Sequence, residues 1–103
     1  MIEFKIFDST WVFEFVKFIP NEGNKTTLGQ TFDASKKITM LENPDINPKY
    51  ARQLLIHELT HAFIDELGFG SQSTWTNEQL AEFMAVNAER IIESAYEIEK
   101  EVK

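Results

Sequence analysis

Hydrophobic and polar residues alternate along the first part of the chain, and this alternation predicts β-structure. Residues 2–7 place three apolar side chains on one face and largely polar ones on the other, the period of a half-buried strand. Asp8 and Ser9 are a turn signal, and residues 10–19 follow as a second run rich in aromatic and β-branched side chains. Apolar side chains occupy both faces of this second run, so we expect a central strand covered on both sides.

The middle of the chain contains strong turn signals and two shorter strand candidates. Residues 20–24, Pro-Asn-Glu-Gly-Asn, predict a loop. A short strand is expected over residues 28–32, and a better-defined one over residues 36–41, where apolar and polar residues alternate. Asparagine, proline and aspartate in residues 43–48 then separate this strand-rich part from the rest of the chain.

The second half of the chain has helical periodicity. Asn47 is expected to cap a helix that begins at Pro48, where the missing N–H costs nothing. The helix is predicted to run to about Leu67 and to stop at Gly68. Its apolar residues span more than half of the circumference, so we expect a largely buried helix.

A second helix is predicted after a loop over residues 68–75. It opens at Thr76, where Gln79 completes a capping box, and it extends almost to Lys103. Strands first and helices afterwards give an α+β layout, with a small, mostly antiparallel N-terminal sheet packed against both helices. The 103 residues contain no internal repeat or linker, so residues 1–103 are expected to form a single domain.

Composition narrows the range of functions. The net charge is −7 without any basic run, so we expect no nucleic-acid-binding surface. The chain has no cysteine, which leaves only histidine and carboxylate side chains to hold a metal such as zinc. No apolar run is long enough to cross a membrane, and the N-terminus lacks the pattern of a signal peptide. A cytoplasmic protein with no membrane partner is the expectation.

The pattern with the clearest chemistry is His-Glu-Leu-Thr-His at residues 57–61, which contains both histidines of the chain. Residues four apart share one face of a helix, so His57 and His61 are able to bind one tetrahedral metal ion, for which zinc is well suited. Glu58 lies about 100° around the helix from His57. There its carboxylate is able to act as a general base without ligating the metal. The alternative is a helix with two exposed histidines and no metal.

A catalytic zinc normally takes three protein ligands, and the third must here be a carboxylate. Asp65 and Glu66 follow His61 too closely on the same helix to reach the same ion. Glu78 and Glu82 are better placed, because they share one face of the next helix and the intervening loop allows the two helices to pack side by side. The alternative is that both are solvated acids, which the start of a helix favours electrostatically.

Two motifs together resemble the gluzincin pattern of thermolysin-type metallopeptidases: His57-Glu58-x-x-His61 and Asn77-Glu78-x-x-x-Glu82. The resemblance implies a zincin-like fold with one zinc per chain and Glu78 as the third ligand. It also implies that Glu82, where the family has aspartate, hydrogen-bonds His57 and orients its ring. The chain is similar in size to the minigluzincins and the small ImmA/IrrE-like peptidases. The resemblance covers mainly residues 38–85.

The function that this resemblance implies is a zinc metallopeptidase acting on a peptide or protein substrate, with Glu58 as the general base. In gluzincins an edge strand just before the metal helix binds extended substrate, and residues 36–41 occupy that place in the sequence. The family also stabilises the oxyanion with a further His or Tyr. No third histidine exists here, and Tyr50 lies about 10 Å along the helix from His57, while Tyr96 is farther from Glu78. We therefore expect weak, latent or narrow activity.

Two other functions are compatible with the same residues. The first alternative is a non-catalytic, zinc-bearing interaction or regulatory module, in which the metal is structural or a relic. The second is a related protein that binds no metal. An intact Glu58 favours the enzyme, because a structural zinc site has no use for a general base.

Overall fold

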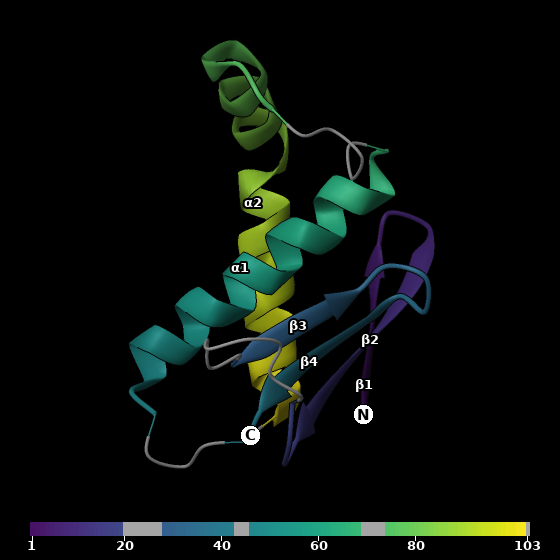
Figure 1. Ribbon diagram of the computed structural model, residues 1–103, viewed down its shortest axis with the longest axis vertical. Helices are drawn as coiled ribbons and strands as arrows, with labels where there is room; N and C mark the ends of the chain where they lie inside the picture. The colour runs from purple at the N-terminus through teal and green to yellow at the C-terminus, as the bar shows by residue number, and fades with distance from the viewer. Residues whose placement is uncertain (20–27, 43–45, 69–73, 103) are drawn as a thin grey trace.

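The strands precede the helices along the chain, as the sequence predicts. The computed structural model describes residues 1–19, 28–42, 46–68 and 74–102. Its elements in chain order are β1 (Ile2–Ile6), β2 (Ser9–Val16), β3 (Gly29–Phe32), β4 (Lys37–Leu41), α1 (Pro48–Glu66) and α2 (Asn77–Val102) (Figure 1). The fold class is therefore α+β. The loop predicted at residues 20–24 lies outside the described residues, as do residues 43–45 and 69–73 of the predicted connections and Lys103.

The four strands form one mixed sheet in the order β1-β2-β4-β3. The β1–β2 and β3–β4 pairs are antiparallel, whereas β2 and β4 run parallel. The prediction of a mostly antiparallel sheet is thus confirmed for two of its three pairings, and the central place of β2 is confirmed. Double coverage of β2 is not observed among the described residues: on the outer face of the sheet Glu14 and Lys37 are partly exposed and form an ion pair of 3.6 Å.

The edge strand next to the predicted metal helix is β3, not β4. The placement of residues 36–41 at the edge was wrong, because a four-residue turn joins β3 to β4 as a hairpin and β4 pairs with β2 on its other side. Lys36 closes this turn with a positive φ of 54°. Edge position depends on which strands pair, and a strand's own sequence does not report it.

One face of the sheet packs on both helices and forms the core. Alternate residues of the strands, among them Trp11, Phe13 and Ile38, meet Leu59 and Phe63 of α1 together with apolar residues of α2. Figure 1 shows α1 crossing α2, with the start of α2 extending beyond α1 and away from the strands. No helix in the described ranges is long and apolar enough to cross a membrane.

The predicted helix ends are confirmed in detail. The Oδ1 atom of Asn47 accepts a hydrogen bond of 2.9 Å from the amide of Lys49, and Gly68 follows α1 with a φ of 82°. At α2, the amide of Gln79 donates to Thr76 Oγ1 at 3.1 Å, and the amide of Thr76 donates to Gln79 Oε1 at 2.9 Å. These reciprocal bonds form a capping box, which sets where α2 begins.

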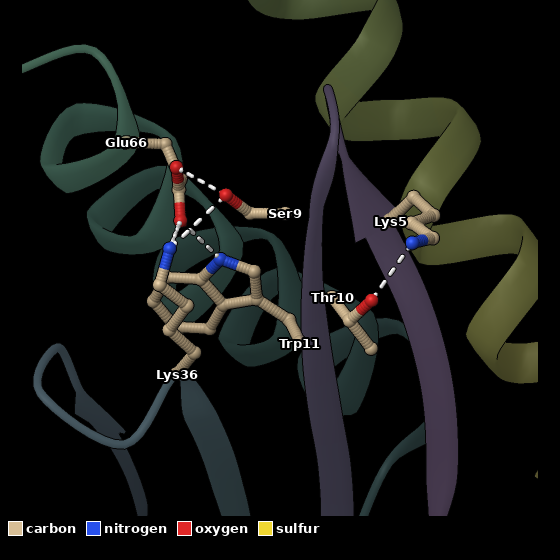
Figure 2. Close-up of polar contacts among 6 residues, drawn as sticks. All are labelled: Lys5, Ser9, Thr10, Trp11, Lys36 and Glu66. Carbon is tan, nitrogen blue, oxygen red and sulfur yellow. Dashed lines mark hydrogen bonds and ion pairs between the residues drawn. The ribbon is translucent and has the colours of Figure 1, made fainter.

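The C-terminal end of α1 is fastened to the sheet by a polar cluster around Glu66 (Figure 2). Glu66 accepts hydrogen bonds from Ser9 Oγ at 2.9 Å, Trp11 Nε1 at 2.8 Å and Lys36 Nζ at 2.7 Å. Burial alone raises the pKa of the Glu66 carboxyl, but these donors and the lysine charge outweigh it, so the net pKa is lowered. The cluster joins α1 to β2 and to the β3–β4 turn, and so holds the predicted metal helix against the sheet.

The pKa of the neighbouring Asp65 carboxyl is shifted in the opposite direction. Burial, a hydrogen bond with Asp33 and the negative charges of Asp33 and Glu66 raise its pKa from 3.8 to about 6. The folded protein therefore holds this proton more tightly than the unfolded chain does. The contribution of Asp65 to the free energy of unfolding therefore falls as the pH rises from about 4 to about 6. Above that range the contribution is lost completely.

Asp65→Asn is expected to raise the unfolding temperature by a few degrees at pH 7 and to leave it nearly unchanged below pH 4. The amide cannot ionise and still reaches Asp33 as a donor. Thermal unfolding of both proteins between pH 4 and pH 7 measures the difference, which should grow across the interval in which Asp65 titrates. Asp8→Asn in the exposed β1–β2 turn is the matched control. If Asp65→Asn raises the unfolding temperature equally at every pH, the proton that Asp65 holds against Asp33 is not the cause of the gain.

Candidate metal centre

The two histidines of the motif converge on one exposed face of α1. His57 and His61 are one helical turn apart, and their Nε2 atoms lie 3.3 Å from each other. The two rings meet edge to face, with centroids 4.9 Å apart and planes at 78°. Both side chains are exposed, while Leu59 between them is completely buried. The buried face of α1 therefore orients the pair outwards, where a solvent ion has access.

The spacing of the two nitrogens fits a tetrahedral zinc ion. Zn–N bonds of 2.0–2.1 Å at the tetrahedral angle place two ligand nitrogens about 3.3–3.4 Å apart, and the observed separation is 3.3 Å. The same distance also suits an N–H···N hydrogen bond between the rings, with a donor role that depends on the tautomer. The separation of the two nitrogens is therefore compatible with either arrangement.

Glu58 is buried beneath the edge strand. Its side chain and backbone are only 6% exposed, and its Oε1 atom accepts a hydrogen bond of 2.7 Å from Thr31 Oγ1. The same hydroxyl lies 3.1 Å from the backbone oxygen of Glu58. Thr31 is paired with Ile38 on the inner face of the sheet, which explains why it points at α1. The carboxylate expected to face the metal is thus held by β3 through one of its two oxygens.

An open pocket of about 380 Å³ connects Glu58 with His57. Its walls come from the beginning of β3 and the first half of α1, and they are about equally polar and apolar. Tyr50, expected to lie well along the helix from His57, lines the same pocket. The lining residues are Leu28, Gly29, Tyr50, Gln53, Leu54, His57 and Glu58. The pocket brings the predicted base and one predicted ligand to a common solvent-accessible space.

Glu78 and Glu82 are not brought to the histidine pair. Both are exposed on the first turns of α2, and Glu82 lines a separate pocket with Trp75 and Phe83. Across residues 1–19, 28–42, 46–68 and 74–102, no group of three His, Asp or Glu side chains is arranged to hold a metal. The structure therefore brings His57, His61 and Glu58 together on α1, and it does not bring Glu78 or Glu82 to them.

Two residues of this site, Thr31 and Gly29, were missed by the sequence reasoning. The sequence places Thr31 in a short strand before the motif. It does not show that the side chain points at Glu58, because that direction follows from the pairing of the strands. Gly29 was read only as part of that strand. A Cβ atom at Gly29 would lie 3.1 Å from both Cγ and Oε2 of Glu58, so the glycine makes room for the carboxylate.

No family model, no curated protein and no solved structure matches this chain. The interpretation of the site therefore depends on its own residues and their geometry.

Gly29→Ala is expected to lower the free energy of unfolding by about 0.5–2 kcal/mol, because crowding of Glu58 exceeds the gain from replacing glycine in a strand. In a Glu58→Ala background the crowding is absent, so the same substitution should stabilise the protein by about 0.5–1 kcal/mol. Urea unfolding of the parent, both single variants and the double variant measures this reversal of sign. Stabilisation in both backgrounds is the contrary result, and it means that Gly29 does not shape the site.

Proposed function

We propose that this protein is a zinc-dependent metallopeptidase with a zincin-like arrangement of sheet and helices. The observation that carries the proposal is the 3.3 Å separation of the Nε2 atoms of His57 and His61, which fits zinc, next to the buried carboxylate of Glu58. The burial of Glu58 supports the proposal, because a buried carboxylate costs free energy and Thr31 is the one described side chain that hydrogen-bonds to it.

His57 and His61 would hold the ion through their Nε2 atoms, and we propose Glu78 as the third ligand. Between residues 77 and 86 only Phe83 is buried. Few apolar contacts therefore oppose a displacement of these first turns of α2 towards α1. Glu82, one turn beyond Glu78, is the proposed hydrogen-bond partner of His57, a contact that would fix the ring tautomer.

When bound, zinc supplies a Lewis acid that polarises a carbonyl group and acidifies water. Within the chain, Glu58 is the residue that we propose to transfer the proton. Thr31 holds its Oε1 atom, and its Oε2 atom has no hydrogen bond to any described residue. Oε2 is therefore the atom that takes the proton from the attacking water and transfers it to the nitrogen of the leaving amine.

The free edge of β3 is the proposed binding site for the substrate backbone. Among the described residues β3 pairs only with β4, so its other edge would offer N–H and C=O groups to an extended peptide. β3 also contains Thr31, which contacts Glu58. A peptide added to this edge would lie beside the general base, which agrees with a peptide or protein substrate.

The second candidate is a non-catalytic zinc-bearing interaction or regulatory module. The observation in its favour is the position of Glu78 and Glu82 on the exposed start of α2. A site completed by a carboxylate from another protein would bind zinc at an interface and would not need the base.

The deciding experiment is hydrolysis of an unfolded protein by the purified chain, with and without equimolar zinc. We expect one zinc per chain by elemental analysis, and cleavage that a chelator stops and added zinc restores. Metal uptake without cleavage of any unfolded substrate favours the interaction module. Absence of uptake at micromolar zinc contradicts both functions.

A further inference from the structure

Strand β1 forms the edge of the sheet opposite to β3. Among the described residues β1 pairs only with β2. Val12 of β2 is the register partner of Glu3, but it donates its N–H to the backbone oxygen of Lys36, at 3.0 Å, on the far side of β2. Backbone groups alternate in direction along an antiparallel strand, so the N–H and C=O groups of Glu3 and Lys5 face away from β2. They are directed towards the open edge of the sheet.

The side chains of the same two residues carry opposite charges. Glu3 and Lys5 are both exposed on the outer face of the sheet, since Phe4 and Ile6 point into the core. Neither takes part in an ion pair within the described ranges, and Lys5 Nζ donates instead to the hydroxyl of Thr10 at 2.8 Å (Figure 2). A lysine on an edge strand normally opposes pairing with another strand. An acid two residues away removes that obstacle for one kind of partner, an antiparallel copy of β1.

A second copy of β1 fits this edge in one antiparallel register. When the Phe4 residues of the two chains lie opposite each other, each Glu3 lies opposite Lys5 of the partner subunit. The outward backbone groups belong to these same residues, so this register forms four backbone hydrogen bonds and two cross-strand ion pairs. Shifting it by two residues in either direction places like charges opposite each other. The other open strand, β3, has the sequence Gly-Gln-Thr-Phe and no charge to select a register.

Helix α2 extends the complementary surface beside β1. An open groove of about 510 Å³ lies between the two elements. Arg90 borders it and lies over the ring of Phe7 at 5.0 Å, without an ion pair to any described residue. The α2 residues that line the groove are spaced three, four and seven positions apart, which places them in one stripe of the helix. They are Arg90, Glu93, Ser94 and Glu97.

This stripe is self-complementary in the same sense as the strand. If two antiparallel copies of α2 meet between Glu93 and Ser94, each Arg90 faces Glu97 of the partner subunit, and each Ser94 hydroxyl faces a Glu93 carboxylate. Phe4 lines the same groove as these residues, so one two-fold axis beside Phe4 serves both the strand and the helix. Charge complementarity of a surface with itself favours a second copy of the chain over an unrelated partner.

We propose that two copies of this chain associate through β1 about this two-fold axis, so that their sheets join into one sheet of eight strands, four from each chain. The contact comprises one short strand and one helix stripe from each subunit, so we expect a dissociation constant of about 10–100 µM. The dimer leaves the histidine pair and the open edge of β3 accessible. It therefore stands or falls independently of the zinc chemistry.

The first test uses the full chain, treated with chelator. Sedimentation equilibrium between about 5 µM and about 1 mM is expected to show a transition from the monomer of 12.0 kDa to a species of twice that mass. Over the same range, amide hydrogen exchange at Glu3 and Lys5 should slow, because their N–H groups become bonded only in the dimer. Exchange at Phe4 and Ile6, which face β2, should depend little on concentration. A monomer at 1 mM overturns the proposal, as does a dimer in which Glu3 and Lys5 exchange as they do in the monomer.

The second test exchanges the charges of the edge. Glu3→Lys and Lys5→Glu each replace both ion pairs by like-charge pairs, so each variant should self-associate about 10–100-fold more weakly than the parent. An equal mixture of the two variants should form a heterodimer with about the parental affinity, because every cross-strand pair is then of opposite charge. Glu42→Lys is the matched control, since Glu42 is exposed just after β4, and it should dimerise like the parent. A mixture that stays monomeric, or single variants that dimerise like the parent, overturns this interface.

Discussion

Glu58→Gln is expected to reduce hydrolysis of an unfolded protein by about 10²–10⁴-fold while zinc still binds with parental stoichiometry. The amide cannot accept a proton from water, so the step assigned to Oε2 is lost. The fold should persist, because glutamine has nearly the same shape and its amide oxygen still accepts the hydrogen bond from Thr31 that the structure shows at 2.7 Å. Hydrolysis rates are measured at saturating zinc, and the zinc content of the same samples is determined. Together the two measurements show whether the substitution affects catalysis without affecting zinc binding.

Thr31 provides a graded comparison for this substitution. Thr31→Ser keeps the hydroxyl and should retain most activity, whereas Thr31→Val keeps the shape and removes the donor, and should lower kcat without changing zinc content. If Glu58→Gln cleaves as fast as the parent, Glu58 is not the base. The buried carboxylate would then act only as a structural link between α1 and the edge strand.

The local parts of this molecule were predictable from sequence, because the signals lie within a few residues of each other. Asn47 and Pro48 set the start of α1, and Gly68 takes the left-handed conformation that ends it. The convergence of His57 and His61 likewise follows from helical periodicity alone. Each of these features depends on backbone geometry over one or two turns.

The order of the strands was not predictable in the same way. The residues of β4 alternate more clearly than those of β3, but each is a plausible edge strand when its sequence is considered alone. Their places depend on the parallel pairing of β2 with β4, a contact between segments more than twenty residues apart. The role of Thr31 was missed for the same reason, since its direction towards Glu58 follows from its pairing with Ile38.

The position of the third ligand also depends on a non-local contact, the packing angle of α2 against α1. Sequence spacing places Glu78 and Glu82 on one face of a helix, but it does not determine how the first turns of that helix lie relative to α1. In the structure these turns extend beyond α1 (Figure 1), and Phe83 is their buried anchor. Coordination of zinc by Glu78 would add the attraction that this weakly packed segment lacks.

Zinc affinity should therefore fall in a definite order when acids of α2 are removed. We expect Glu78→Ala to weaken binding by more than about 100-fold, as His61→Ala should, because each removes a ligand, and Glu82→Ala by about 10–100-fold, because it removes the partner of a ligand. Glu89→Ala should have no effect, since Glu89 lies about 10 Å beyond Glu82 along α2. All three glutamates are exposed, so their removal should not unfold the protein. Competitive titration against a chromophoric chelator measures the four affinities.

Each departure from that order has a structural meaning. If Glu82→Ala is the most damaging of the three glutamate variants, Glu82 is the ligand and the register of α2 is one turn away from that proposed. If Glu78→Ala, Glu82→Ala and Glu89→Ala all bind zinc like the parent while His61→Ala does not, the first turns of α2 remain extended as in the structure. The histidine pair then takes its third ligand from another molecule, and the protein acts as a zinc-bearing interaction module.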